Sequence, residues 1–416
     1  MKKSVSLLAA LLTLAACTNQ SSYLVLPNQL NAPKKAFNIE VSETANDKYI
    51  ESLQSFALDY YGVLDNKENH VFSPLSIATC YSMLYDGTDG KTKQELKNML
   101  HYNDSFNHLH EIKNMLLKNA INDTKENTYL DIAQCIMMDG PNVVKQTYVD
   151  KLTDYYYAEI FKSIDKQLAA DWVNGKTKDF LDVKPDDFNF NINTTVVLLN
   201  TIYAKAPWAI ADLFKEKNNA NRTFTTRDNT KSSVAFMIGS QEDTSYYLAE
   251  TYRIASLPYK HDMYLNILLP NEGSDYDAVL KDQEALKSLV NYQNIGKNQY
   301  GTINWKLPKF KIQQKYDLME VLRGLGLDET FSDTPNFANM VEPDLEGLLY
   351  IGSSRHDAGI EVSNEGVEAA AYTVIEIETK SAMPSKPVVF DVNHPFAYSL
   401  TTSEGYPLFM GVINSL

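Results

Sequence analysis

The stretch Gly366–Lys380 reads Gly-Val-Glu-Ala-Ala-Ala-Tyr-Thr-Val-Ile-Glu-Ile-Glu-Thr-Lys, and two structural signals overlap in it. Every second residue from Val367 onward is small or apolar, whereas the acidic residues stand between them, at Glu368, Glu376 and Glu378. This alternation predicts a β-strand with one face suited to a core. Yet the stretch opens with glycine, contains three alanines of low strand propensity and ends in Lys-Ser-Ala-Met-Pro-Ser-Lys-Pro, which is typical of an exposed loop. The segment is therefore expected to serve as both loop and strand; an ordinary half-buried strand with a polar exit is the alternative.

The composition is that of a large globular chain. Its 416 residues, 44% of them hydrophobic, can bury a large core as one big domain or two. A net charge of −15 without a basic stripe argues against a nucleic-acid partner. Cys80 and Cys135 fall on apolar faces of an expected helix and strand, and we expect buried free thiols; a disulfide is the alternative.

Residues 1–17 are typical of an export signal. Two lysines precede the apolar run Val5–Ala16, which is too short to span a bilayer comfortably. The run ends in Leu-Ala-Ala-Cys, which resembles a bacterial lipobox, so the thiol of Cys17 would carry diacylglycerol and tether the protein to the cell envelope. Plain secretion is the alternative. Thr18 is not the aspartate that marks inner-membrane retention in some bacteria, which favours the outer membrane.

The remainder divides into a linker, residues 18–45, and one domain, residues 46–416. The linker lacks sustained periodicity. The domain begins with helical patterns and becomes strand-rich later, which favours an α+β fold with a mixed or antiparallel sheet. Helices are expected over 46–60, 74–84, 106–121 and 318–325, with Thr92 capping another, and strands over 129–138, 194–204, 264–270 and 300–312.

No motif nominates an enzyme or a cofactor. His108-Leu109-His110-Glu111 resembles a metal site, but residues two apart on a helix do not face each other. Gly90-Lys91-Thr92 resembles the end of a phosphate loop, although position 85 is tyrosine where glycine is required. Nucleophile elbows, His-Glu-x-x-His and Cys-x-x-Cys are absent from the sequence, so a hydrolase would need a scattered triad for which no residues stand out.

Several motifs in a fixed order resemble the serpin family, over nearly everything from Asn46 to Leu416. They are Val71–Ile77, Leu199–Lys205 followed by Trp208, Leu307–Ile312, Leu325–Leu327 with Phe331-Ser332, His356–Val362, Asn364–Ala371, His394–Phe396 and Pro407–Gly411. The resemblance implies three β-sheets, about nine helices and an exposed reactive-centre loop. A target protease would attack this loop and become acylated, and the loop would then insert into the main sheet.

The resemblance also assigns roles to individual residues. The hinge of the loop would comprise Gly366, Val367, Glu368, Ala369, Ala370 and Ala371. The polar cluster at the centre of the main sheet, which serpin terminology calls the shutter, would comprise Ser73, Ser76, Asn200 and His356. Trp208 and Lys309 would lie at the breach, where the sheet opens. Asn364 stands where the family often has a glutamate that pairs with the lysine, so control of sheet opening is expected to be looser here.

The reactive bond is expected at Lys380-Ser381, fifteen residues from the hinge glycine as family loops commonly run. A lysine before the bond suits a trypsin-like serine protease, whose pocket carries a carboxylate; papain-like cysteine proteases are a second target class. Thr379-Lys380 or a bond near Met383 is the alternative. We further expect a monomer, no cofactor and no acceleration by polyanions. A non-inhibitory serpin that acts as a binding or structural module is the rival function.

Overall fold

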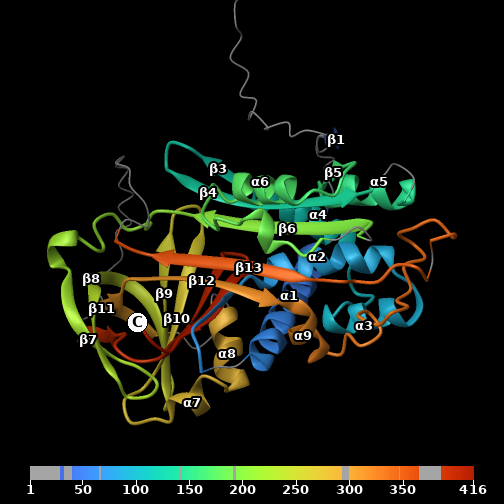
Figure 1. Ribbon diagram of the computed structural model, residues 1–416. Coiled ribbons are helices and arrows are strands. Elements are labelled where there is room, and N and C mark those ends of the chain that lie inside the picture. The colour runs from blue at the N-terminus through green and yellow to red at the C-terminus, as the bar shows by residue number, and fades with distance from the viewer. Residues whose placement is uncertain are drawn as a thin grey trace, which may run out of the picture.

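The computed structural model describes residues 29–31, 40–64, 67–139, 143–190, 194–292, 299–345, 347–364 and 386–416. Within these ranges it contains nine α-helices and three β-sheets of five, nine and two strands (Figure 1). The predicted α+β class with three sheets and about nine helices is therefore confirmed. No helix of the described ranges has the length and apolarity that a bilayer-spanning helix needs.

Side-chain caps mark the start of several of the nine helices in the described ranges. They are α1 (Glu43–Val63), α2 (Pro74–Gly87), α3 (Gly90–Met99), α4 (His108–Asn119), α5 (Gln146–Tyr155), α6 (Lys166–Lys176), α7 (Tyr276–Val279), α8 (Gln283–Val290) and α9 (Leu318–Arg323). Ser73 caps α2, and its side chain accepts a hydrogen bond from the Ser76 N–H. The prediction that Thr92 caps α3 is wrong. Asp89 is the cap, and the buried Thr92 hydroxyl instead accepts from the Asn336 N–H.

The five-stranded sheet is built around two long antiparallel strands, β4 (Thr128–Met138) and β6 (Val196–Lys205). Strand β3 (Ile121–Asp123) is antiparallel to β4, and β5 (Glu159–Phe161) is parallel to it. Strand β1 (Gln29–Asn31) pairs with β5, so part of the segment predicted as a linker belongs to the sheet.

The two-stranded sheet consists of β12 (Phe310–Asp317) and the antiparallel β13 (Arg355–Val362). The stretch predicted to be strand-rich, 300–312, is strand except at Lys309, where the chain leaves one sheet at Pro308 and joins another at Phe310. Strand β13 runs beside β6 and in the same direction in Figure 1. Among the described residues, no backbone ladder joins β6 to β13. The five-stranded and two-stranded sheets therefore lie edge to edge. We call the unpaired gap between their edge strands, β6 and β13, the seam.

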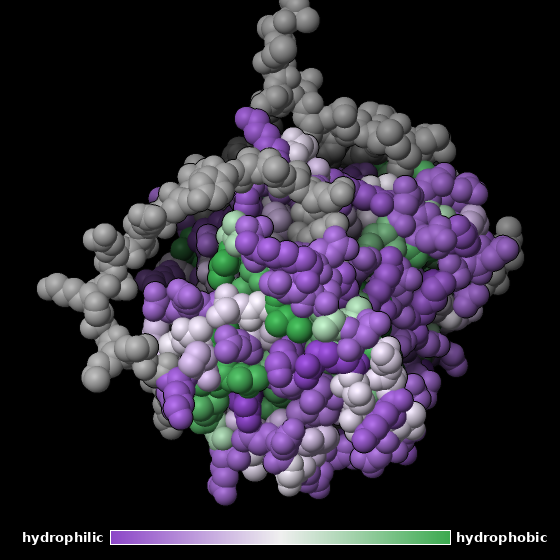
Figure 2. Space-filling model, turned by 90° about the vertical axis from the view of Figure 1, so that its left-hand side faces the viewer, coloured by the Kyte–Doolittle hydropathy of each residue, from purple (hydrophilic) through white to green (hydrophobic). Residues whose placement is uncertain are grey.

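The nine-stranded sheet forms the other half of the molecule. Its strands run in the order β14 (Val388–Asp391), β11 (Gln299–Pro308), β8 (Lys231–Leu248), β9 (Tyr252–Tyr259), β10 (Met263–Pro270), β15 (Phe396–Thr402), β16 (Pro407–Ile413) and β2 (His70–Phe72), with β7 (Ala220–Thr225) also on β8. Figure 2 shows the side of the molecule on which β7 and β8 lie, where apolar side chains form separate patches among hydrophilic ones. The most exposed large apolar residue of this sheet is Tyr300.

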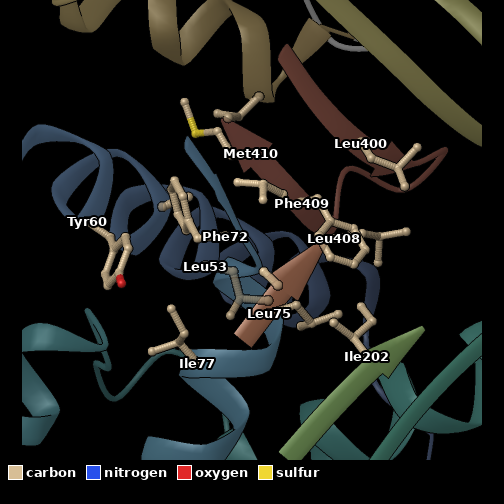
Figure 3. Packing of buried hydrophobic residues seen from close by; sticks show 14 of the residues in the cluster. Leu53, Tyr60, Phe72, Leu75, Ile77, Ile202, Leu400, Leu408, Phe409 and Met410 are labelled. Atoms are coloured by element: carbon tan, nitrogen blue, oxygen red, sulfur yellow. The ribbon is translucent and has the colours of Figure 1, made fainter. Parts of the chain in front are cut away.

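The main core lies where α1 and α2 pack on the C-terminal strands (Figure 3). Leu53 and Tyr60 of α1 meet Phe72, Leu75 and residues of β16 there, all of them buried. Gly411 of β16 permits the close approach of β2, because a Cβ atom at this position would lie 2.0 Å from the His70 carbonyl oxygen. The core thus fixes α2, whose first turn reaches the seam between β6 and β13.

Candidate functional site

The seam between β6 and β13 holds a cavity of about 260 Å³ lined by both apolar and polar residues. One wall is formed by residues 194–201, which include the start of β6, and the opposite wall by residues 348–357, which lead into β13. Residues of α2, including Ile77, Tyr81 and Leu84, line it from the core side, and Leu181, Phe188 and Phe190 line it from the outer side. The walls are therefore two strand-forming segments without a shared ladder.

The four predicted shutter residues come together at the first turn of α2. The Ser73 N–H donates to His356 Nε2 of β13 at 3.0 Å. The Ser76 hydroxyl donates to Asn200 Oδ1 of β6. The start of α2 thus holds one strand on each side of the seam with one hydrogen bond to each. The Asn200 Nδ2 has no hydrogen-bond partner among the described residues, so it can still donate to a further acceptor group.

His356 is held in its neutral form by burial. The side chain is 6% exposed, and desolvation lowers the pKa of the imidazole from 6.5 to about 3. Because Nε2 accepts from the Ser73 N–H, the neutral ring carries its proton on Nδ1. Protonation of Nε2 would remove the acceptor that ties β13 to α2. Acid is therefore expected to weaken this link.

The His356 link predicts acid-sensitive stability. The folded-state pKa lies below that of the unfolded chain, so stability is fully present above about pH 6.5 and falls as the pH drops toward about 3, by at most about 1.4 kcal/mol per pH unit. His356→Gln keeps a hydrogen-bond acceptor but does not titrate, so its melting temperature should fall less steeply over this range than that of the wild type. Thermal unfolding at a series of pH values measures the difference. His110→Gln, at a half-exposed histidine of α4, is the control and should retain the wild-type slope; equal slopes for all three proteins would contradict the prediction.

Neutral groups close the end of the seam that lies beyond the C-terminal ends of β6 and β13. Trp208 stacks on Tyr259 with ring centroids 4.3 Å apart, and its Nε1 donates to the Ser363 carbonyl oxygen at 3.0 Å. Asn364 and Asn219 exchange amide hydrogen bonds of 2.7 and 2.9 Å. Asn364 Nδ2 also donates to the Phe214 carbonyl oxygen at 2.8 Å. At Asn364, where the family often has a charged glutamate, the structure thus has an uncharged amide pair with Asn219.

The other predicted site residues are placed as follows. Lys309 joins β11 to β12, and its backbone N–H donates to the Ala235 carbonyl oxygen at 2.9 Å. The predicted hinge Gly366–Ala371, the predicted reactive bond Lys380-Ser381 and the predicted lipid-attachment residue Cys17 lie outside the described residues. His108 and His110 have separate neighbours, the Asp86 carboxylate and the Tyr155 ring.

Cys80 and Cys135 are both free thiols, as predicted. Cys135 is fully buried in β4, whereas Cys80 is only half-buried and lines the cavity. Burial raises the pKa of the Cys80 thiol to about 12, so it is un-ionised at neutral pH.

The chain belongs to the serpin family, because the family model described as Serpin (serine protease inhibitor) matches residues 51–416. Human serpin B3 is 27% identical over 365 residues, which cover 80% of this chain and 90% of that protein. Neuroserpin of Gallus gallus is 27% identical over 408 residues, which cover 94% of this chain and 95% of that protein. Serpins are typically protease inhibitors.

Solved serpin structures share the fold. A thermophilic serpin, tengpin, in its native state gives a TM-score of 0.75 at 23% identity, covering 92% of this chain and 96% of its own. Human thyroxine-binding globulin gives a TM-score of 0.74 at 21% identity, covering 90% and 99%. The same fold is therefore shared with a protein named for binding thyroxine.

Proposed function

We propose that this chain traps serine proteases as a suicide substrate, with residues 366–380 entering the seam between β6 and β13 as a new strand. The observation that carries the proposal is the unpaired seam itself. Strands β6 and β13 run in the same direction in Figure 1 and share no ladder in the described part of the chain. A strand of opposite direction would pair with both. The chain that follows β13 has this direction if it turns back after Asn364.

In the proposed reaction, the serine of a trypsin-like protease attacks the Lys380 carbonyl carbon. The bond to the Ser381 nitrogen breaks, and the acyl group stays on the protease. The released strand then moves into the seam and carries the bound enzyme with it. Papain-like cysteine proteases would form the corresponding thioester. Ser73, Ser76, Asn200 and His356 would position the two strands that part.

The loop sequence suits a strand whose one face is buried. Its alternate residues Val367, Ala369, Ala371, Thr373, Ile375 and Ile377 carry no charge. Burying the three larger apolar side chains would contribute roughly 1.5–3 kcal/mol each. About a dozen backbone hydrogen bonds would add roughly 0.5–1.5 kcal/mol apiece. Both sums are upper bounds, and both favour insertion.

The second candidate function is that of a non-inhibitory serpin that acts as a binding module. The fold shared with thyroxine-binding globulin supports this candidate. Val367 also stands where inhibitory members usually have threonine or serine. The absence of charge on the core face of the loop favours the inhibitor, because a binding module would not need that face to be uncharged.

Incubation with trypsin tests the proposal. We expect an SDS-resistant complex of inhibitor and protease, and a large rise in melting temperature once the loop has been cut. Catalytically dead trypsin is the control and should give neither. Clean cleavage of the loop with no complex and no gain in stability would reject the inhibitor and favour the binding module.

Export and lipid attachment at Cys17 are likewise proposed. The lipobox-like Leu-Ala-Ala-Cys supports them, and an outer-membrane anchor would present a monomeric inhibitor to proteases near the cell envelope. Cys17→Ala should release the protein from the membrane fraction.

A further inference from the structure

Residues 177–190, which we call the strap, follow α6 and cross the outer side of the seam. Along its length the strap packs on the sheet of β4 and β6 through its apolar side chains. Leu181, Val183, Phe188 and Phe190 pack in a second core cluster with outer-face residues of these strands, Ala133, Cys135, Met137, Val197 and Leu199. Val183 and Phe188 are buried. This half of the attachment is apolar.

The strap is also attached to β12 and β13, on the far side of the seam. Gln313 Nε2 of β12 donates to the Phe180 carbonyl oxygen at 2.8 Å. The Phe180 ring lies directly over Gly359 of β13, where a Cβ atom would stand 2.7 Å from its Cε1. The same ring lies 6.2 Å from that of Tyr203 in β6. Phe180 thus contacts both sides of the seam.

A group of four charges fixes the second attachment point. Asp187 Oδ1 lies 3.1 Å from Lys315 Nζ of β12, and Asp187 Oδ2 lies 3.6 Å from Arg355 Nη2 of β13. Arg355 Nη1 donates to the Asp187 carbonyl oxygen. Arg355 Nε donates to both oxygens of Asp357 at 2.9 Å, which holds the guanidinium in place.

This charged group is partly shielded from water. The side chains of Asp187 and Arg355 are each 23% exposed, and that of Asp357 is 14% exposed. Two carboxylates face two cations, so the group is neutral as a whole. Ion pairs at this depth are worth more than fully exposed ones, yet salt still weakens them.

We propose that Asp187, Arg355, Asp357 and Lys315 form an ionic clamp that holds the strap across the seam and sets the rate at which the seam opens. The strap supplies Leu181, Phe188 and Phe190 to the outer wall of the cavity, so the outer-face side chains of an entering strand would meet these residues. That the open seam admits residues 366–380 rests on the proposed function. The clamp itself is a property of the uncleaved protein and can be tested there.

Hydrogen–deuterium exchange of the uncleaved protein tests the clamp. Asp187→Asn removes the charge but keeps an oxygen that can still accept from the Lys184 N–H, as Asp187 Oδ2 does at 2.9 Å. Strap amides should exchange about fivefold to tenfold faster in this variant than in the wild type. Asp186→Asn makes the same charge change at an exposed neighbour and should leave exchange within about twofold.

Two further readouts decide the proposal. Raising NaCl from about 0.05 M to about 1 M should speed strap exchange in the wild type but much less in Asp187→Asn. Lys315→Met removes the most exposed partner, whose side chain is 59% exposed, and should give a smaller increase in the same direction. Equal strap exchange in Asp187→Asn and Asp186→Asn, or equal salt dependence in wild type and Asp187→Asn, would overturn the clamp.

Trypsin trapping separates this result from the proposed function. If the seam admits the loop, Asp187→Asn should form the SDS-resistant complex with fewer inhibitor molecules consumed per protease trapped. Faster strap exchange without a complex in any variant would support the clamp and reject the inhibitor. A normal complex with unchanged strap exchange in Asp187→Asn would reject the clamp and retain the inhibitor.

Discussion

Replacing Ala371 with arginine should turn the chain from an inhibitor of trypsin into a substrate. In the inserted strand Ala371 would face the core, where α2 packs beneath the seam. An unpaired guanidinium at such a position would oppose insertion by several kcal/mol. The protease would then complete hydrolysis before the strand had moved. We expect the number of inhibitor molecules consumed per trypsin trapped to rise at least about tenfold, since a 1.4 kcal/mol change already alters a ratio of rates tenfold.

Ala370 provides the matched control. It is the adjacent alanine, and by strand periodicity it would share the outer face with Glu368. Ala370→Arg places the same side chain one position away and should leave trapping nearly unchanged. Titration of trypsin with each variant, followed by SDS gels, gives the comparison. Undiminished inhibition by Ala371→Arg would contradict insertion, and equal losses in both variants would show that face alternation does not matter.

Local sequence signals predicted the parts of the fold that depend on near neighbours. Ser73-Pro74 predicted the start of α2 because the cap and the first-turn proline act within a few residues. The apolar runs of β4 and β10 predicted buried strands. Thr92 was misassigned because its hydroxyl serves Asn336, which lies 244 residues further along the chain. No local pattern carries that information.

The contacts that close the seam could not be predicted for the same reason. Asn219 and Asn364 are 145 residues apart and Asp187 and Arg355 are 168 apart. Each pair exists only because separate sheets bring the residues together. The shutter residues were located because family motifs surround them, whereas the strap is rich in Asp and Lys and reads as an ordinary solvated loop. The sequence predicted that Asn364 cannot form the family's ion pair, but its amide partner Asn219 could not be predicted from the sequence.

Replacing Lys380 with alanine should lower the rate of trypsin inhibition by at least about a hundredfold, because a pocket built for a cation rejects a side chain that leaves its carboxylate unpaired. Lys380→Arg keeps the charge and should keep most of the rate. Lys386→Ala removes another lysine six residues further along the chain and should leave the rate unchanged. Progress curves with each variant measure the rate constants, and mass spectrometry of the C-terminal fragment locates the cut.

The fragment separates the position of the bond from the mechanism. A cut at Lys380-Ser381 gives a fragment that begins with Ser381; a fragment beginning at Lys380 or close to Met383 would move the bond to the alternatives. Because Lys380 would not be one of the core-facing residues of the inserted strand, the loop of the Lys380→Ala variant should still insert. It should therefore trap an elastase-like protease, whose small pocket accepts alanine, at a rate above that of the wild type. Trypsin inhibition at the wild-type rate by Lys380→Ala would place the reactive bond elsewhere. A loss of trapping toward both proteases would instead mean that Lys380 acts in strand insertion and not in protease recognition.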